Sequence, residues 1–388
     1  MRVAIAGGSG FLGGHVCEAL LESGHQVVVL SRGSRRPVPG ALSLACDVTR
    51  DVPAELLRGC DAVVNLIGIK REDRRQSFAS AHVGATRRLI GACASAGVRR
   101  FVHVSVVCSR PDPKLPYHDT KWQAEEIVRG SGLAFTILRP GVIYGRGDDM
   151  VTHLVRMLRF AAVFPVVGAG DSLLQPVDVR DVAQAVAASL QRPASVGRSI
   201  DVVGPAPMTL RSVIETVAQG IALPPRIVAT PLSLQRAAVG VMEATMQAPL
   251  STPAQLQMLV EGMTADPGPA SRELGLVPRP FTAAAVASLA DDIGPLFGFS
   301  LRLADTSAQR AWLARHASGF GSALALSAIA LALQALLAVV LPNVWFRMAP
   351  GGARSREVSR SRSRTFPSAS RCCCWPPSAP ARSGASWW

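Results

Sequence analysis

The sequence predicts an α/β protein built on a doubly wound parallel sheet. Short apolar runs alternate with segments of helical spacing over the first 145 residues, and the first run leads directly into the glycine-rich turn at 7–13. The runs are apolar throughout, which is typical of strands that are buried on both faces. Apolar strands that alternate with helices indicate a parallel sheet with helices on both sides.

The expected elements follow one another in a regular order. Strands are predicted over residues 1–6, 26–30, 42–45, 62–67, 101–105 and 134–138. Helices are predicted over residues 14–23, 54–59, 80–96 and 120–129. We therefore assign a first domain to residues 1–145. Beyond it the alternation loosens and Pro-rich joints appear, so residues 146–300 are expected to form a smaller, mostly helical substrate region.

The glycine turn has the spacing of a dinucleotide cradle. Gly8, Gly10 and Gly13 make G-x-G-x-x-G, and Gly7 starts a looser G-x-x-G-x-x-G. Between a strand and a helix, such glycines allow a tight turn, a close backbone approach to pyrophosphate and close helix packing, as in a Rossmann domain. The helix N-terminus offers free N–H groups to the phosphates. The residues expected to bind here are Gly7, Gly10, Phe11, Leu12 and Gly13.

The ends of the second and third strands bear on which dinucleotide is bound. An NAD site places a carboxylate after the second strand, whereas an NADP site uses an arginine against the 2′-phosphate. Here the residues are Ser31 and Arg32, so NADP(H) is favoured over NAD(H), with a solvated basic loop as the alternative. Asp47 and Val48 follow the third strand, where a carboxylate can accept from the adenine amino group. Asp47 can also act as a helix N-cap.

Tyr117 and Lys121 are the second feature that points to chemistry. A spacing of four places both side chains on one face of a helix. A free phenol titrates near a pH of about 10, too high for a base at neutral pH. A nearby ammonium and an oxidised nicotinamide ring would both favour the phenolate. Tyr117 is therefore a candidate acid/base and Lys121 its partner, although the same spacing also occurs by chance.

Taken together, these motifs resemble the extended short-chain dehydrogenases/reductases over about residues 1–300. Besides the glycine turn, Asp47-Val48 and Tyr117-x-x-x-Lys121, the resemblance rests on Val64-Asn-Leu-Ile-Gly68, Val102-His-Val-Ser105, Leu138-Arg-Pro-Gly141, Tyr144-Gly145 and Gln175-Pro-Val-Asp-Val-Arg-Asp-Val182. The Asn-Leu-Ile-Gly and His-Val-Ser segments look most like the atypical branch that contains the NADPH-binding accessory subunit of respiratory complex I and its bacterial relatives.

The resemblance implies roles for individual residues. In that family the Tyr is the general acid/base, the Lys holds the nicotinamide ribose and a Ser orients the substrate. Tyr117 and Lys121 match, and Ser105 stands at the strand end, but the usual position of the Ser holds Val107. His82 occupies a helix that often contributes an Asn, and we expect it to be a satisfied core residue. The resemblance also implies cofactor contacts at Leu66, Ile67, Gly68 and Pro140.

Two functions from different classes remain open at this point. The first is a reductase, epimerase or dehydratase that moves hydride between NADP(H) and a carbonyl or carbinol carbon, with Tyr117 moving the proton. The second is a non-catalytic NADPH-binding module that supports a membrane respiratory or quinone-related complex. The substrate is not specified by any residue of the 146–300 region.

Charge and cysteine content exclude other classes. The net charge is +14, but residues 347–388 carry eight Arg against one Glu, so half of the excess lies in this segment and nucleic-acid binding is not expected. The isolated residues Cys17, Cys46, Cys60, Cys93 and Cys108 are typical of reduced cytosolic thiols. Three adjacent cysteines at 372–374 lack zinc spacing, so no metal site is expected.

The C-terminal part has a different composition. Residues 317–346 contain no charged residue and are long enough to span a bilayer as a helix, with a buried hairpin as the alternative. We expect this helix to anchor a cytoplasmic catalytic domain to the inner face of the plasma membrane. Residues 347–388 are expected to be a disordered Arg/Ser/Pro-rich tail, and they also resemble an out-of-frame reading of GC-rich DNA. A single span would export this tail, against the positive-inside bias.

Overall fold

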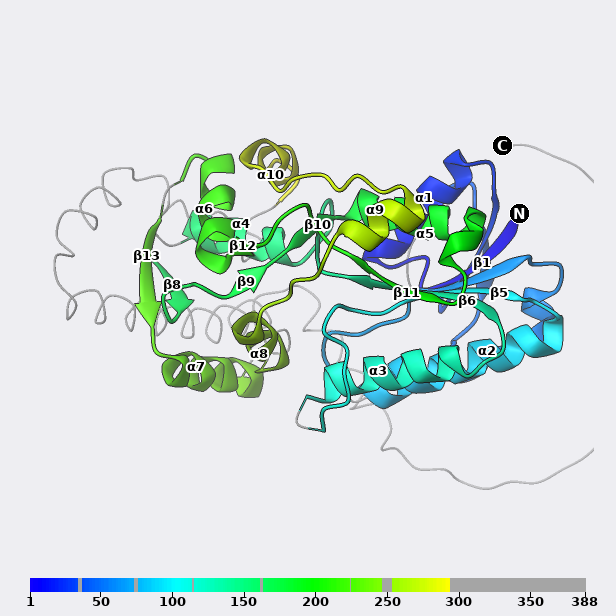
Figure 1. The fold of residues 1–388 in the computed structure, drawn as a ribbon. Helices are drawn as coiled ribbons and strands as arrows, with labels where there is room; N and C mark the ends of the chain where they lie inside the picture. Colours follow the sequence, from blue (N-terminus) through cyan, green and yellow to red (C-terminus); the bar gives the residue numbers. More distant parts are fainter. Residues whose placement is uncertain are drawn as a thin grey trace, which may run out of the picture. The chain divides into compact units, whose positions relative to one another are not determined.

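A parallel sheet of seven strands forms the centre of the part that the structure describes (Figure 1). This computed structural model describes residues 1–33, 37–72, 76–113, 115–160, 163–223, 225–245 and 253–293. The strand order is β11-β6-β5-β4-β1-β2-β3. In chain order the bounds are β1 (Arg2–Ala6), β2 (Gln26–Ser31), β3 (Leu42–Ala45), β4 (Ala62–Asn65), β5 (Arg100–Val104), β6 (Ala134–Pro140) and β11 (Arg198–Val202).

The order of strands reverses between β1 and β4. From β1 the chain proceeds to β2 and β3 on one side, and then crosses to β4, β5 and β6 on the other. In open parallel sheets, ligands bind outside the carboxyl ends of the strands at such a switch point. The glycine turn follows β1 and the Leu66–Gly68 loop follows β4, so both flank this point.

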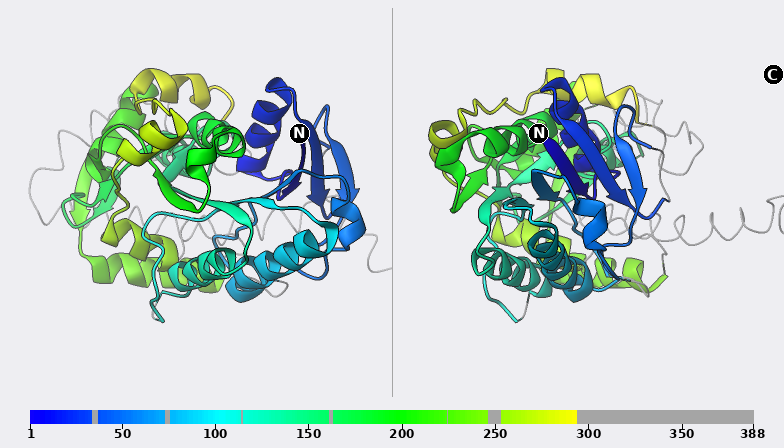
Figure 2. Two further views of the ribbon diagram at one scale, coloured as in Figure 1. Left: turned by 45° about the vertical axis from the view of Figure 1, so that its right-hand side comes forward. Right: turned by 90° about the vertical axis from the view of Figure 1, so that its right-hand side faces the viewer.

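Helices cover both faces of the sheet, as Figures 1 and 2 show. On one face lie α1 (Phe11–Glu22), α5 (Val179–Gln191) and α9 (Gly268–Leu274), and on the other α2 (Ala85–Ala96) and α3 (Pro116–Arg129). Successive residues of β1 point to opposite faces. Val3 and Ile5 therefore join the core under α1 and α5, whereas Ala4 and Ala6 join the core under α2.

The sheet agrees with the sequence prediction except for one further strand, and the helices differ in their bounds. Helices α1 and α3 begin at Phe11 and Pro116, three and four residues before the predicted starts at 14 and 120. All six predicted strands are confirmed, but β11 was not predicted, because Arg198–Val202 is short and partly polar. Residues 54–57 form a single 3₁₀ turn, η1 (Ala54–Leu57), where a helix was expected. The helix predicted from residue 80 begins as a π-helical turn, η2 (Ala79–Gly84), and continues as α2.

The region after residue 145 contributes both to the sheet and to a separate core. Its predicted helical character is confirmed by α4 (Met150–Phe160), α6 (Leu210–Gly220), α7 (Leu232–Thr245), α8 (Pro253–Glu261) and α10 (Ala283–Ala290). However, β11, α5 and α9 from this region pack on the main sheet. Short strand pairs join the helices, namely β7 (Val142–Tyr144) with β10 (Pro176–Asp178), β9 (Leu173–Leu174) with β12 (Met208–Thr209), and β8 (Val163–Val167) with β13 (Arg226–Thr230).

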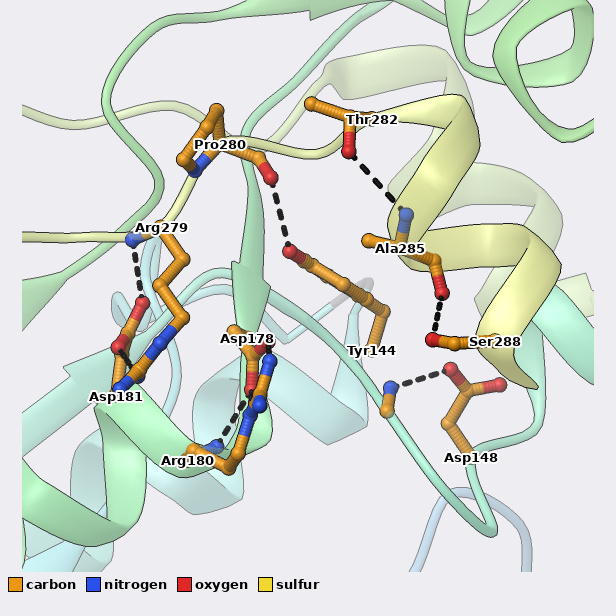
Figure 3. Close-up of polar contacts among 11 residues, drawn as sticks. Tyr144, Asp148, Asp178, Arg180, Asp181, Arg279, Pro280, Thr282, Ala285 and Ser288 are labelled. Atoms are coloured by element: carbon orange, nitrogen blue, oxygen red, sulfur yellow. Dashed lines mark hydrogen bonds and ion pairs between the residues drawn. The ribbon is translucent and has the colours of Figure 1, made fainter. Parts of the chain in front are cut away.

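The segment that leads into α10 is tied to the end of β7 and to α5 (Figure 3). Tyr144 donates a hydrogen bond from its hydroxyl to the carbonyl oxygen of Pro280, 3.3 Å away. The buried carboxylate of Asp181 accepts from the backbone N–H of Arg279 at 2.7 Å and from its guanidinium. Asp178 caps α5 through the N–H of Arg180 at 2.8 Å. The Tyr-Gly and Val-Asp-Val-Arg-Asp motifs thus hold this region on the sheet.

Two further sequence predictions concern a membrane-spanning helix and free cysteine thiols. Among the described residues, no helix is long and apolar enough to cross a bilayer. The predicted span at 317–346 and the tail at 347–388 lie outside the described residues. Cys17, Cys46, Cys60, Cys93 and Cys108 are free thiols, as predicted.

Candidate functional site

The glycine turn joins β1 to α1 with its backbone packed closely. Gly7 has a φ of +86°, a conformation that favours glycine, and its carbonyl oxygen accepts from the N–H of Gly10 at 2.9 Å. A methyl group at Gly13 would collide with that same carbonyl oxygen and with Gly8. The helix then begins at Phe11 with Gly10 as an N-cap that has no side-chain hydrogen bond. The first N–H groups of α1 therefore have no capping side chain, which suits an anion such as pyrophosphate.

The buried side-chain amide of Asn65 holds the loop after β4 in place. Asn65 accepts from the N–H of Ile67 at 3.0 Å, and its amide nitrogen lies 3.0 Å from Thr86 Oγ1 and 3.2 Å from His103 Nδ1. The N–H of Leu66 donates to the carbonyl oxygen of Ala6 at 2.9 Å. These bonds hold the predicted Leu66–Gly68 contact segment beside the glycine turn, where a methyl group at Gly7 would lie 3.2 Å from the Leu66 carbonyl carbon.

Tyr117 lies in the first turn of α3, with its ring surrounded by other rings. Phe78, His82 and His118 each meet it edge-on, with ring centroids 5.6, 5.5 and 5.6 Å away. The residue is partly buried and also packs against the core of the 146–293 region, which includes Val107. Burial raises the pKa of Tyr117 to about 12. Without a bound ligand, the phenol is therefore protonated at neutral pH.

Lys121 lies one turn further along α3 and is almost fully buried. Its Nζ donates to the carbonyl oxygen of Val104 at 3.3 Å, and a methyl group at Gly68 would lie 3.1 Å from it. Burial lowers the pKa of Lys121 to about 8, although the carboxylate of Glu125 opposes the shift. The structure thus brings the predicted Lys121 to the predicted Gly68, between the ends of β4 and β5.

Ser105 and the buried Glu125 form a layer next to Lys121. Ser105 is 5 % exposed, and its Oγ makes no hydrogen bond of ordinary geometry in the described structure. Glu125 accepts from Arg139 Nε at 2.9 Å and from Ser109 Oγ at 2.5 Å. Burial raises the pKa of Glu125, but the hydrogen bonds from Arg139 and Ser109 outweigh this effect, so the pKa is lowered overall. The sequence did not reveal Glu125; its i+4 spacing from Lys121 was the available signal.

His82 is a satisfied core residue, as predicted. It is 1 % exposed and lies in the π-helical turn η2. Its Nε2 accepts from the N–H of Ile69 at 3.2 Å, and its Nδ1 lies 2.9 Å from Thr120 Oγ1. Burial, followed by the charge of Lys121, lowers the pKa of His82 to about 2. The ring is therefore neutral throughout the physiological range.

The ends of β2 and β3 place Arg32 near Asp47. Asp47 accepts from the N–H and the hydroxyl of Thr49 at 3.1 and 2.6 Å. The Thr49 hydroxyl, and then the charges of Arg32 and Arg50, lower its pKa against a burial effect. Asp47 thus caps a turn after β3, while Val48 is buried in the core. The predicted helix N-cap at Asp47 is wrong, because the next helical turn, η1, begins at Ala54 with Pro53 as its N-cap. Two further arginines that follow Arg32 closely in the sequence, Arg35 and Arg36, lie outside the described residues.

A cavity of about 330 Å³ lies beside the start of α1, in the 146–293 region. It is lined by the loop from Gly145 to Asp149, by α4 and by the end of α10. A methyl group at Gly147 would lie 3.7 Å from the ring of Phe11, and Arg146 O is 3.2 Å from His15 Nε2. Pro140 comes just before β7 in the chain, at the end of β6. Its carbonyl oxygen accepts from the N–H of Val107 at 3.0 Å.

Residues 3–203 match the sequence model of the NAD dependent epimerase/dehydratase family, a stretch that holds the glycine turn, Tyr117 and Lys121. The chain belongs to this family. This confirms the resemblance that the motifs predicted. The description of this family names dependence on NAD.

Relatives of known name include two mitochondrial NADH dehydrogenase subunits. Over 246 residues the chain is 29% identical to an Arabidopsis thaliana protein, mitochondrial NADH dehydrogenase (ubiquinone) 1 alpha subcomplex subunit 9, covering 60% of this chain and 61% of the relative. It is 26% identical over 284 residues to the Neurospora crassa NADH-ubiquinone oxidoreductase 40 kDa subunit, covering 71% and 75%. Its match to the plant relative thus spans about three fifths of that protein's length.

Solved structures confirm the fold. The UDP-glucuronic acid 4-epimerase from Bacillus cereus, in complex with NAD, superposes with a TM-score of 0.59 over 76% of this chain and 98% of that protein, at 20% identity. At such identity the likeness concerns the fold alone, because one fold hosts many chemistries.

Proposed function

We propose that the protein is an NADP(H)-dependent oxidoreductase or epimerase-type enzyme of the extended short-chain dehydrogenase/reductase class. Hydride transfer takes place at a carbonyl or carbinol carbon, with Tyr117 as acid/base and Lys121 as its partner. The observation that supports this best is the burial of the Lys121 ammonium against Gly68, one helical turn from Tyr117. Burying an amine is unfavourable, and such perturbed groups concentrate at functional sites.

The chain's residues fit a dinucleotide along the edge of the sheet. Gly7, Gly10 and Gly13 allow the pyrophosphate to approach the backbone, and the first N–H groups of α1, at Phe11 and Leu12, meet its charge. The proposed contacts along the rest of the edge are Asp47, Val48, Leu66, Ile67, Gly68, Lys121 and Pro140. A nicotinamide dinucleotide bound here supplies or accepts the hydride.

Tyr117 carries the proton in this proposal. In the reducing direction it donates the phenolic proton to the carbonyl oxygen as the carbon gains hydride, so the carbonyl becomes a hydroxyl. In the oxidising direction the phenolate takes that proton back. The ammonium of Lys121 stabilises the phenolate, which offsets the effect of burial on the pKa of Tyr117. Ser105 is assigned to the edge of the site, because its buried hydroxyl lies near Glu125.

The NADP(H) preference rests on Arg32. This exposed side chain follows β2, and its charge lowers the pKa of Asp47 at the end of β3. No carboxylate follows β2 to bind the ribose hydroxyls of NAD. An arginine is well suited to a 2′-phosphate, because its planar fork binds phosphate oxygens in pairs.

The second candidate is a non-catalytic NADPH-binding module that supports a membrane respiratory or quinone-related complex. Val107, buried in the second core, stands where the family places a substrate-orienting Ser. The names of the plant and fungal relatives also point to a respiratory assembly. In this case the buried Tyr117 and Lys121 would retain the cofactor without turnover.

Cofactor binding separates the two candidates. Purified protein is titrated with NADPH and NADH by nucleotide fluorescence, and the release rate of NADPH is measured. Fast exchange supports an enzyme, and a substrate screen over carbonyl and carbinol compounds then follows. NADPH that stays bound through purification supports the module. If neither nucleotide binds, both candidates fail.

The acid/base role is tested on a matched pair of substitutions. The chain has only two tyrosines, Tyr117 and Tyr144, so Tyr144→Phe is the control for the loss of a phenol. Tyr117→Phe should abolish turnover while nucleotide affinity changes less than about threefold. Turnover unchanged in Tyr117→Phe would refute the proposed mechanism.

A further inference from the structure

The imidazole of His82 connects two parts of the candidate site that are far apart in sequence. One ring nitrogen, Nε2, accepts from the backbone N–H of Ile69, in the loop after β4. The other, Nδ1, lies 2.9 Å from the hydroxyl of Thr120 on α3. Thr120 stands between Tyr117 and Lys121, so one ring joins the helix that carries both side chains to the loop that carries Gly68.

The partners of His82 fix the direction of each hydrogen bond. Ile69 offers an N–H, so Nε2 must be the unprotonated nitrogen of a neutral ring, and the proton is on Nδ1. Nδ1 then donates to Thr120 Oγ1. The Thr120 hydroxyl donates in turn to the carbonyl oxygen of Pro116, 2.6 Å away, at the start of α3. This chain of bonds ends on the helical turn that holds Tyr117.

Ring packing reinforces the bridge. Phe78 stacks on His82 with centroids 5.4 Å apart, and Tyr117 meets the same ring edge-on at 5.5 Å. The backbone of η2 is held at this point as well, because Thr86 Oγ1 donates to the carbonyl oxygen of His82 at 2.6 Å. π-Helical turns of this kind are rare and are found mostly at functional sites.

We propose that His82 is a positioning residue that sets where the phenol of Tyr117 lies relative to the ammonium of Lys121. This inference rests on the proposed function of Tyr117 as acid/base. His82 itself transfers no proton, because both of its nitrogens are engaged and its ring is neutral. Its effect passes through Thr120 to the first turn of α3, and through Ile69 to the loop against Lys121.

The charged and titratable groups around the pair come from three elements. His82 and His118 contact the ring of Tyr117 from η2 and α3. Lys121 interacts electrostatically with Glu125 on α3 and with His103 on β5. His82 and His103 are neutral, and Glu125 is ionised in its ion pair with Arg139. Once bound NADP⁺ brings the pKa of Tyr117 below that of Lys121, the Lys121 ammonium is therefore the main protein charge that a displaced phenol would lose.

The test follows the pKa of Tyr117 in the NADP⁺ complex of the full chain. In a Tyr144→Phe background Tyr117 is the only tyrosine, so tyrosinate absorbance reports on it alone. His82→Asn keeps a donor near the position of Nδ1, His82→Gln keeps an acceptor near that of Nε2, and His82→Leu keeps neither. His25→Asn, at a buried histidine near Gln191, is the matched control.

We expect His82→Leu and His82→Gln to raise the pKa of Tyr117 by about one unit. His82→Asn, which keeps the bond to Thr120 but not that to Ile69, should raise it by less, and His25→Asn should leave it near that of the parent. One unit is about the change when a phenolate and an ammonium move from roughly 4 to roughly 6 Å apart at an effective dielectric constant of about 20. Thr120→Val removes the same bond from its other end and should raise the pKa equally.

Other outcomes overturn specific claims. If His82→Leu binds NADP⁺ and leaves the pKa of Tyr117 unchanged, His82 has no positioning role. If the His82 variants do not fold, Thr120→Val decides, and an unchanged pKa in that variant overturns the inference. If the parent binds no NADP⁺, or keeps the pKa of Tyr117 near 12 in the complex, the proposed function fails and the inference with it.

Discussion

Lys70 Nζ and Asp149 Oδ2 lie 2.8 Å apart and join the loop after β4 to the loop after β7. Both loops border the cradle, because Gly68 lies two residues before Lys70 and Gly147 lies two residues before Asp149. Both loops are also fixed independently: Ile69 is bound to His82, and Arg146 O lies close to His15 on α1. This ion pair therefore links two loops that each approach the segment from Gly7 to Phe11.

Breaking the Lys70–Asp149 pair should speed the release of NADPH. The two side chains are 58% and 60% exposed, so the pair contributes weakly, and Lys70→Ala or Asp149→Ala should raise the release rate about two- to fivefold. The charge-swapped double variant, Lys70→Asp with Asp149→Lys, should return toward the parent rate. Stopped-flow release at low and high salt measures this, and the Arg198–Glu273 pair on another surface is the control. Equal effects at both pairs would contradict the prediction.

Adjacent glycines in α1 should respond in opposite ways to alanine. At Gly13 a methyl group would collide with backbone atoms of Gly7 and Gly8, whereas at Gly14 there is open space. Gly13→Ala should lower the free energy of unfolding by about 1–3 kcal/mol or more and weaken nucleotide binding. Gly14→Ala should raise the free energy of unfolding by up to about 1 kcal/mol, because alanine has a higher helix propensity than glycine. Chemical denaturation and nucleotide titration measure both effects, and a stable, fully binding Gly13→Ala protein would refute the cradle geometry.

The buried ammonium of Lys121 should lower the free energy of unfolding, although the residue is the proposed partner of Tyr117. Burial lowers its pKa from 10.5 to about 8, which corresponds to a cost of at most about 3 kcal/mol. Below pH 8 the folded and unfolded states are both protonated, so the cost is fully present. Between pH 8 and about 10.5 the folded state releases its proton first, and stability rises with pH.

Lys121→Met should therefore be more stable than the parent at pH 7 by up to about 3 kcal/mol, and its advantage should shrink from about pH 8 upward. Turnover should fall in the same variant. Denaturant midpoints across pH 6–10 measure the stability, with the exposed Lys70→Met as a control. An advantage that did not depend on pH would mean that the buried amine does not titrate in this range.

Cofactor choice should follow the charge at Arg32. Arg32→Asp should weaken NADPH binding by about tenfold or more, the amount of a charge-assisted hydrogen bond, and strengthen NADH binding. Arg58→Asp, on an exposed turn away from the strand ends, tests the general effect of charge. If the ratio of the NADPH and NADH dissociation constants stays constant in Arg32→Asp, the NADP(H) preference is not set there.

Membrane association through residues 317–346 stays a prediction of the sequence. Carbonate washing should leave the full chain in the membrane pellet and release a chain that ends at residue 316. A full chain found entirely in the supernatant would exclude an integral anchor at this segment.

The sequence by itself determined the sheet and the glycine turn. Apolar runs of strand length and the Gly7–Gly13 spacing are local signals, because strand burial and a tight turn depend on residues close together in the chain. For the same reason Tyr117 and Lys121, four residues apart on one helix, could be paired before the structure. The seventh strand β11 carried no comparable pattern, since Arg198–Val202 contains an arginine, a serine and an aspartate and so lacks the continuous apolar run of the other strands.

Only the tertiary structure decided which polar groups surround that pair. His82 meets Ile69 and Thr120 across 13 and 38 residues, and Glu125 meets Arg139 across 14. Lys70 meets Asp149 across 79 residues. Each contact forms because the carboxyl ends of parallel strands converge at one edge of the sheet, which a one-dimensional pattern does not record. The two candidate catalytic residues are thus local in sequence, whereas the groups that set their pKa and position are assembled by the fold.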